Sequence, residues 1–375
     1  MSVLLTPLKL GTTTISNRVG MSALTRNRSS NTVPNDLMLK YYVQRATGGA
    51  GLIVSEGILI SRQGTEWPAA PGIWDEAQTE GWKKITDAVH EAGSKIYAQV
   101  CLVGRTSHPD APEQIAAGTP VYAPSAISAR GGKFRFLPGA PGYVKPTETE
   151  DPTILIAQFK EAAINAKAAG FDGVELHGAS GYLVHQFLDS TSNQRTDKWG
   201  GSSENRTRFA LETLRVLVEV FGADVAVKLS PASGYNDVGM PLQDTIDTFG
   251  HLLHEADKLG LAYVTLVSLS FPFTFTFAGD GSAPPHDVVS TYSPFLTQTP
   301  IFVNSGVTLA EAEELVGSGQ AAGVFIGMDW VTHPDLGMRI QAGKQLDNMP
   351  DFATLYGAEG GDPAVGYLDY KEALY

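Results

Sequence analysis

The chain has 375 residues, of which 43% are hydrophobic and 18% charged, a composition typical of globular proteins. With 40 acidic and 27 basic side chains its formal net charge is −13, which disfavours binding to nucleic acid or to anionic lipid. A chain of this length forms either two domains or one large α/β barrel.

Short apolar runs alternate with longer amphipathic segments along the whole chain, which is typical of a parallel α/β fold. Eight such runs are present, and eight strands close a barrel. We therefore predict α/β architecture in the form of a single (β/α)8 TIM barrel, one domain over residues 1–375. Strands are expected at residues 19–24, 52–57, 96–100, 173–177, 225–230, 263–268, 301–305 and 324–327, and helices at 35–47, 76–92, 153–169, 203–221, 242–259 and 309–316.

Two segments depart from the alternation, and a third could be mistaken for a membrane span. Residues 8–15 are predicted to form an N-terminal β-hairpin around Gly11 that caps one end of the barrel. Residues 102–150, after the third strand, form a long insertion rich in Gly and Pro, and long loops of this kind are often lids over a site. Residues 260–279 carry no charge but contain Pro272, so they indicate a buried strand and a loop rather than a membrane span.

In a barrel of this kind the reactive groups stand at the C-terminal ends of the strands. The residues found there include few acid–base pairs of the hydrolytic kind and no cluster of metal ligands, so no metal is expected. This absence favours redox chemistry by a bound cofactor. The candidates are Ser22 to Thr25, Glu56, Gln99, Cys101, His177 and the residues after it, Lys228, Ser268, Asn304 to Val307, Gly327 and Met328.

The densest motif follows the fourth strand, where residues 175–188 read ELHGASGYLVHQFL and a polar run continues to Phe209. With MSALTR at 21–26, PGIW at 71–74, YAQ at 97–99 and GYLDY at 366–370, this closely resembles the old yellow enzyme family. The resemblance spans nearly the whole chain. The motif at 21–26 is weak alone, whereas the run from His177 to Phe209 is highly specific.

The resemblance implies FMN-dependent reduction of the activated C=C bond of an α,β-unsaturated carbonyl compound, with NADPH or NADH as reductant. Hydride would pass through the flavin in a ping-pong sequence, while His177 and Ser180 polarise the carbonyl and Tyr182 donates the proton. A lone histidine is more often a buried structural residue, but Tyr182 at the right offset favours function. Relatives usually have Asn or His where this chain has Ser180, whose hydroxyl donates only one proton.

For the flavin ring, the resemblance implies that Thr25 lies near the C4 carbonyl, Gln99 at the pyrimidine edge and Lys228 near N1 and the C2 carbonyl. A lysine reaching solvent is the alternative for Lys228. Its charge would stabilise negative charge on the flavin, although it lacks the planar fork of the family's usual arginine. The remaining residues expected to contact the ring are Ala23, Leu24 and Gly57.

For the phosphate, Ser305 and Gly306 after the seventh strand and Gly327 after the eighth suit close approach of backbone N–H groups. The family's phosphate arginine is replaced here by Met328. Either another cation, such as Arg339, takes its place, or FMN is held less tightly. Ordinary tight turns are the alternative for both glycines.

The substrate is expected to be a small enone or enal. Cys101 stands where relatives often carry a large aromatic residue, which predicts a wider pocket. Phe273 and Phe275 lie on one face of an extended segment and form either an apolar gate or a packed strand. Tyr367, from the C-terminal motif, is a further candidate for the pocket.

Two other functions stay open. The altered residues Ser180, Lys228 and Met328 are compatible with a flavin-containing isomerase, cyclase or dehydrogenase of a pathway intermediate. A barrel that has lost its cofactor would be a binding protein or scaffold. One cysteine and the absence of a signal peptide at the N-terminus predict a cytoplasmic protein. We expect a monomer or homodimer.

Overall fold

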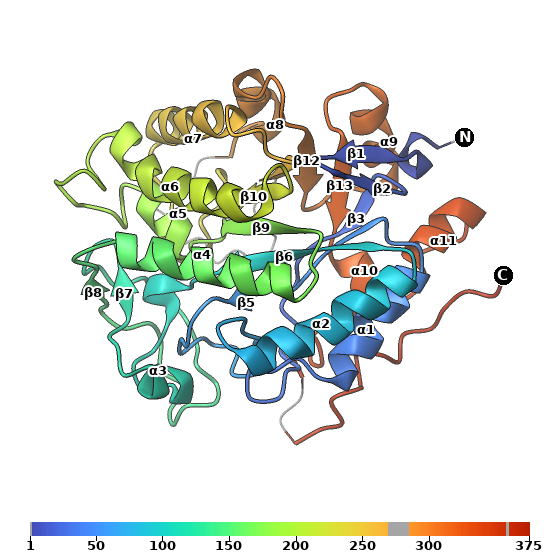
Figure 1. Cartoon of the computed structure of the whole chain (residues 1–375), viewed down its shortest axis with the longest axis horizontal. Helices are drawn as coiled ribbons and strands as arrows, with labels where there is room; N and C mark the ends of the chain where they lie inside the picture. The colour runs from blue at the N-terminus through green and yellow to red at the C-terminus, as the bar shows by residue number, and fades with distance from the viewer. Residues whose placement is uncertain (1, 269–284, 358–359) are drawn as a thin grey trace.

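The computed structural model describes residues 2–268, 285–357 and 360–375. In these ranges eight parallel strands pair in a ring, and pairing of β4 with β6 closes it (Figure 1). The predicted (β/α)8 TIM barrel is confirmed. The barrel strands are β3 (Val19–Met21), β4 (Leu52–Val54), β6 (Lys95–Cys101), β9 (Gly173–Gly178), β10 (Val225–Leu229), β11 (Tyr263–Val267), β12 (Ile301–Asn304) and β13 (Gly323–Ile326), and short β5 (Ile58–Leu59) pairs with β6.

The six predicted helices are present and cover the outside of the barrel. Several begin where a side-chain oxygen accepts a hydrogen bond from the first turn, as Asn35 does from Met38 and Asp75 from Gln78. They are α1 (Asp36–Thr47), α2 (Glu76–Glu91), α4 (Thr153–Ala168), α6 (Ser203–Phe221), α7 (Leu242–Asp257) and α9 (Leu309–Gly317).

Five further helices were not predicted, because each is too short to show a full amphipathic period. They are α3 (Pro112–Ala117), α5 (Leu183–Leu188), α8 (Val288–Tyr292), α10 (Met328–Thr332) and α11 (Leu336–Ala342). Within the described ranges, no helix combines the length and the apolar character needed to cross a bilayer.

The predicted hairpin is formed by β1 (Leu8–Leu10) and β2 (Thr13–Ile15). Leu10 and Ile15 are fully buried and belong to the same apolar cluster as aromatic residues of the barrel interior. The Thr12 backbone N–H donates to Asp224, which stands just before β10. The hairpin therefore closes the N-terminal end of the barrel and leaves the C-terminal end for chemistry.

The insertion at 102–150 contains η2 (Gly104–Thr106), α3, β7 (Tyr122–Ala123) and β8 (Thr147–Glu148). Figure 1 shows it at the opposite end of the molecule from the hairpin. Arg130 forms an ion pair with Asp237 in the loop between β10 and α7, and Arg105 donates to the Asp237 carbonyl oxygen at 2.5 Å. The insertion is thus fastened to the C-terminal face of the barrel, and its role as a lid stays a prediction.

Candidate active site

A buried carboxylate organises the barrel interior below the C-terminal face. Glu175 on β9 accepts hydrogen bonds from the Gln99 side-chain amide at 2.7 Å and from the Thr265 hydroxyl at 3.0 Å. Gln99 is the register partner of Glu175 on β6, and Thr265 stands on β11. Burial raises the pKa of Glu175, while the positive charge of Lys228 and these hydrogen bonds oppose the rise.

Lys228 does not reach solvent. Its ammonium is buried and donates to the Ser22 hydroxyl at 3.1 Å, across the barrel from β10 to the end of β3. Burial lowers the pKa of Lys228, and the Glu175 charge counteracts this. The sequence predicts a cation here, and the structure holds it inside the barrel mouth. Along the paired strands, Lys228 lies two residues closer to the C-terminal face than Glu175.

His177 is the register partner of Lys228 and is also buried. Burial lowers the pKa of His177 to about 3, helped by the nearby charges of Lys228 and His185, so the imidazole is neutral at physiological pH. The Ala179 backbone N–H donates to His177 Nδ1 at 3.3 Å. This bond assigns the single ring proton to Nε2, which makes Nε2 a hydrogen-bond donor.

Tyr182 faces the histidine. The two ring centroids are 5.1 Å apart and the planes meet at 86°. Tyr182 is half-buried against an apolar cluster that includes Cys101 and Val103. Burial raises the pKa of Tyr182 well above its ordinary value, as do the neighbouring groups Tyr235 and Cys101, so the phenol keeps its proton. Burial also raises the pKa of the Cys101 thiol to about 12, so it is not a thiolate.

Ser180 lies between these two residues in the chain, with its backbone in the left-handed region at φ +58°. Its N–H donates to the Ser230 hydroxyl at 2.9 Å, and its carbonyl oxygen accepts from the Asn236 amide at 2.9 Å. The side chain is half-buried. The structure thus brings the three predicted catalytic residues together, with His177 near the end of β9 and Ser180 and Tyr182 in the turn between β9 and α5.

The predicted cofactor residues after β3 and β4 also meet at this face. Ala23, Leu24 and Thr25 are half-buried, and a Cβ built on Gly57 would lie 3.7 Å from Gln99 Oε1. Glu56, named among the strand-end candidates, accepts from the backbone N–H groups next to Thr25, those of Arg26 and Asn27. These bonds fasten the loop after β3 to the end of β4.

The predicted phosphate residues lie at the ends of β12 and β13. Ser305 and Gly306 both have positive φ, at +78° and +70°. The backbone N–H groups of Gly306 and Gly327 donate to no other residue in the described ranges. A Cβ on Gly327 would lie 3.3 Å from Leu24. Backbone N–H groups without a partner in the described ranges, placed where the loops after β3 and β13 come close together, suit the binding of an anionic group.

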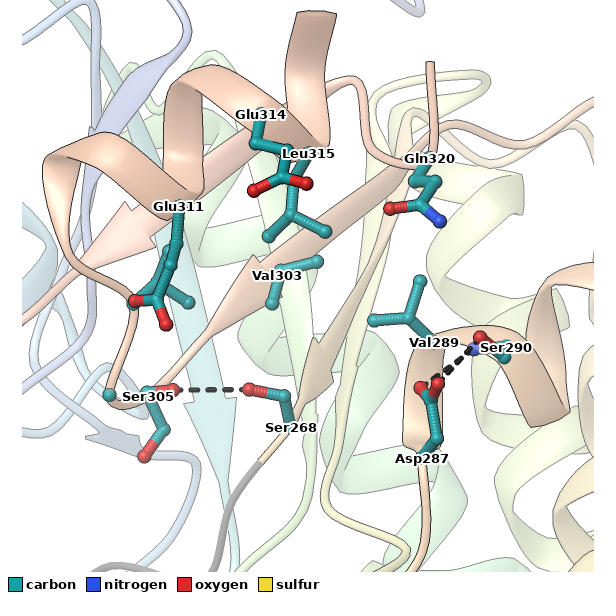
Figure 2. A pocket seen from close by; sticks show the side chains of 12 residues that line it. Ser268, Asp287, Val289, Ser290, Val303, Ser305, Glu311, Glu314, Leu315 and Gln320 are labelled. Atoms are coloured by element: carbon teal, nitrogen blue, oxygen red, sulfur yellow. Dashed lines mark hydrogen bonds between the residues drawn. The ribbon is translucent and has the colours of Figure 1, made fainter. Parts of the chain in front are cut away.

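Figure 2 shows a pocket of ≈ 330 Å³ beside this loop, lined by Ser268, Ser305 and three carboxylates. The Ser268 hydroxyl donates to the Ser305 carbonyl oxygen at 3.1 Å. The carboxylates belong to Asp287, Glu311 and Glu314, which would repel a phosphate. The described lining of this pocket therefore does not suit a phosphate.

Arg339 is not the missing phosphate cation. Its guanidinium forms ion pairs with Asp335 at 2.8 Å and Asp347 at 2.7 Å, and it also donates to the carbonyl oxygens of Gln345 and Lys371. Both its charge and its donors are used within the C-terminal region. The other alternative, a phosphate held without this arginine, is the one that fits the structure, with Met328 half-buried at the start of α10.

Tyr367 does not line a cavity as predicted. Its ring is fully buried and stacks on Tyr41 at 4.2 Å, with the Arg26 guanidinium 4.9 Å from the ring centroid. The residue of the C-terminal segment that reaches the site is Tyr356, which stacks on Trp67 at 4.0 Å and lies near Tyr182. Sequence reasoning missed this pair because neither residue lies in a motif or at a strand end.

Phe273 and Phe275, the predicted gate, lie outside the described residues. The described part of the site nevertheless fits an isoalloxazine ring. The side-chain NH2 group of Gln99 is bound to Glu175, so its side-chain oxygen is left as an acceptor. Lys228, whose charge interacts with the same Glu175, offers a buried positive charge. These two groups match the donor and acceptor atoms of a flavin pyrimidine ring.

Comparison with known proteins shows which family the chain is similar to. The model of the NADH:flavin oxidoreductase / NADH oxidase family matches residues 3–347. The chain is 38% identical to chanoclavine-I aldehyde reductase fgaOx3 of Penicillium roqueforti, with 99% of this chain and 96% of that protein covered. It is 35% identical to a probable flavin mononucleotide-dependent alkene reductase of Leishmania infantum, with 98% and 97% covered. The old yellow enzyme homologue of Zymomonas mobilis superposes with a TM-score of 0.87 at 32% identity, over 98% of this chain and 99% of that one.

Proposed function

Because the chain belongs to the NADH:flavin oxidoreductase / NADH oxidase family, the family of the old yellow enzymes, we propose that it is an ene-reductase. It uses NADPH or NADH and bound FMN to reduce the activated C=C bond of an α,β-unsaturated aldehyde or ketone. The observation that carries this proposal is the neutral His177 ring held edge-to-face against the protonated phenol of Tyr182.

Gln99, Lys228 and the loop after β3 would hold the flavin ring. The backbone N–H groups of Gly306 and Gly327, which have no partner among the described residues, would hold its phosphate. The chemistry that FMN supplies when bound is two-electron transfer, in which hydride from the nicotinamide is passed on to the β-carbon of the alkene. Lys228 stabilises negative charge that develops on the pyrimidine side of the ring.

His177 and Ser180 polarise the substrate carbonyl. The Nε2–H of neutral His177 donates to the carbonyl oxygen, and the Ser180 hydroxyl supplies a second donor. Two donors aimed at an oxygen that gains negative charge lower the barrier, because they are in place before the charge develops. They also withdraw electrons from the conjugated β-carbon, which makes it electrophilic.

Tyr182 completes the reaction by protonating the α-carbon. Its raised pKa keeps the phenol protonated throughout the physiological range, so the proton is available in every turnover. The phenolate left behind regains a proton from solvent, to which the half-buried side chain has access. The apolar cluster around Cys101 and Trp67 would take the hydrocarbon part of the substrate.

The substrate class draws support from two relatives whose names include aldehyde reductase and alkene reductase. We place the enzyme in the reducing cytoplasm because its single cysteine, Cys101, is buried and unpaired. A monomer or homodimer is part of the same proposal.

Steady-state oxidation of NADPH and of NADH in the presence of 2-cyclohexenone and cinnamaldehyde tests the proposal. Consumption of either nucleotide with formation of the saturated carbonyl compound supports it. Conversion of substrate without nucleotide consumption would instead indicate an isomerase or cyclase. A colourless protein that takes up no FMN would indicate a scaffold.

A further inference from the structure

Asn236, in the loop between β10 and α7, contacts both the insertion and the turn after β9 that carries Ser180. The Asn236 Nδ2 donates to the Ser180 carbonyl oxygen at 2.9 Å. The Tyr143 hydroxyl, from the insertion, donates to Asn236 Oδ1 at 2.8 Å. A continuous chain of hydrogen bonds thus runs from the insertion at 102–150 to the peptide group of Ser180.

This loop is itself held in one conformation. Asn236 and Asp237 both have left-handed backbones, with φ of +59° and +60°. The Asp237 carboxylate accepts from the Arg130 backbone N–H at 2.9 Å and from Arg130 Nε at 2.8 Å, and its carbonyl oxygen accepts from Arg105. Two arginines of the insertion therefore fix the residue next to Asn236.

The contact between the two loops is tight. A Cβ built on Gly181 would lie 2.4 Å from the Tyr235 carbonyl oxygen and 2.7 Å from the Asn236 Cβ. Gly181 also has positive φ, at +67°, immediately after Ser180 at +58°. Left-handed conformations of residues other than glycine cost of order 1 kcal/mol or more and persist only where the surroundings hold them. Here Ser230 holds the Ser180 N–H and Asn236 holds its carbonyl oxygen.

We propose that Asn236 and Tyr143 are positioning residues for Ser180, so that the insertion helps to aim the second hydrogen-bond donor at the substrate carbonyl. The inference rests on the proposed function only in taking the Ser180 hydroxyl as a hydrogen-bond donor to the substrate carbonyl. The serine side chain is short. The direction of its hydroxyl therefore depends more strongly on the backbone conformation than the direction of a longer amide side chain does. Hydrogen bonds to both the N–H and the carbonyl oxygen of Ser180 therefore compensate for the shortness of its side chain.

Three variants separate the two hydrogen bonds. N236G removes the side chain but tolerates the left-handed backbone. N236D keeps the acceptor for Tyr143 but places a carboxylate oxygen against the Ser180 carbonyl. Y143F removes the hydroxyl that donates to Asn236 and that also interacts with the Glu66 carboxylate, and it leaves the bond from Asn236 to Ser180 in place. Y122F, which changes a half-buried tyrosine on β7 of the same insertion, is the matched control.

The expected effects follow from the strength of one hydrogen bond, which is equivalent to a factor of about 3 to 10 in an equilibrium. With 2-cyclohexenone we expect KM to rise by about that factor in N236G and Y143F and by more in N236D, with a smaller change in kcat. The same factor is expected in the Kd of 2-cyclohexenone for the oxidised enzyme without reductant. S180A should raise KM as well, and N236G should add little to it, since both changes act on one donor.

Hydrogen–deuterium exchange of the peptide over residues 178–188 gives a readout that needs no activity. We expect faster exchange in N236G, N236D and Y143F than in wild type and Y122F. Unchanged exchange would overturn the inference, as would additive KM effects of S180A and N236G. If wild type fails to reduce any enone, the proposed function is wrong, while the exchange data still decide whether Asn236 and Tyr143 hold Ser180.

Discussion

The side-chain amide of Gln99 donates to Glu175 at 2.7 Å, which leaves Gln99 Oε1 as an acceptor at the barrel mouth. An amide is symmetric enough in shape to bind in either orientation, and the carboxylate removes that ambiguity. Glu175 thereby decides which hydrogen-bonding group Gln99 presents to a ligand. The same carboxylate is also the counter-charge of buried Lys228.

The pairing of Glu175 with Lys228 predicts a double-mutant cycle. K228M should lower the free energy of unfolding of the apoprotein by about 3 kcal/mol, because it leaves a buried carboxylate without a cation. E175Q/K228M should recover most of that loss, because neither charge remains. Urea unfolding followed by circular dichroism measures both. Additive losses in the double variant would show that the two groups do not interact.

Y182F should slow the oxidative half-reaction with 2-cyclohexenone by roughly 100- to 10,000-fold, since the proton donor is lost. The reductive half-reaction with NADPH or NADH should change by less than about 3-fold, because protonation of the α-carbon takes no part in it. Anaerobic stopped-flow spectroscopy separates the two halves. Equal losses in both would argue for a general structural role of Tyr182.

The low pKa of His177 predicts a pH profile. Because burial lowers that pKa from 6.5 to about 3, the imidazole stays neutral from pH 5 to pH 8, and KM for 2-cyclohexenone should not change with its titration. In the unfolded chain the ring takes up a proton below about pH 6.5. The free energy of unfolding should therefore fall as the pH decreases from 6.5 towards 3, and H177Q should lessen that fall. A KM that titrates near pH 6.5 in wild type, and not in H177Q, would contradict the assignment.

M328R places an arginine where the resemblance to the family implies a cation at the phosphate. A charged hydrogen bond to phosphate should tighten FMN binding by about 10- to 100-fold, an effect that weakens in high salt. M338R adds the same charge at an exposed methionine on α11 and serves as the control. Fluorescence titration of the apoprotein with FMN measures both. Equal affinities in the two variants would mean that residue 328 does not face the phosphate.

The barrel could be predicted because each strand is a short apolar run and each long helix shows its amphipathic period. The positions of Gln99, His177 and Lys228 followed, because parallel strands bring their C-terminal ends to one face. The short helices α5 and α10 lack that period and were missed. Tyr356 and Trp67 were missed because their stacking joins loops almost three hundred residues apart, a contact for which single-sequence patterns carry no signal.

The contacts that Arg339 and Tyr367 make could not be predicted, for a related reason. A spare arginine and a motif tyrosine are chemically suited to a phosphate and a pocket. Their actual partners, Asp335 and Tyr41, are set by how the C-terminal segment packs on the barrel. Side chains that leave regular strands need tertiary information before a role can be assigned.

The most direct test of the account is anaerobic mixing of the purified protein, reconstituted with FMN, first with NADPH or NADH and then with 2-cyclohexenone. We predict that the flavin absorbance near 450 nm is bleached by one or both nucleotides and is restored by the enone, with one equivalent of cyclohexanone formed. A protein that binds no FMN, or one whose bleached flavin is not reoxidised by any enone or enal, would contradict it.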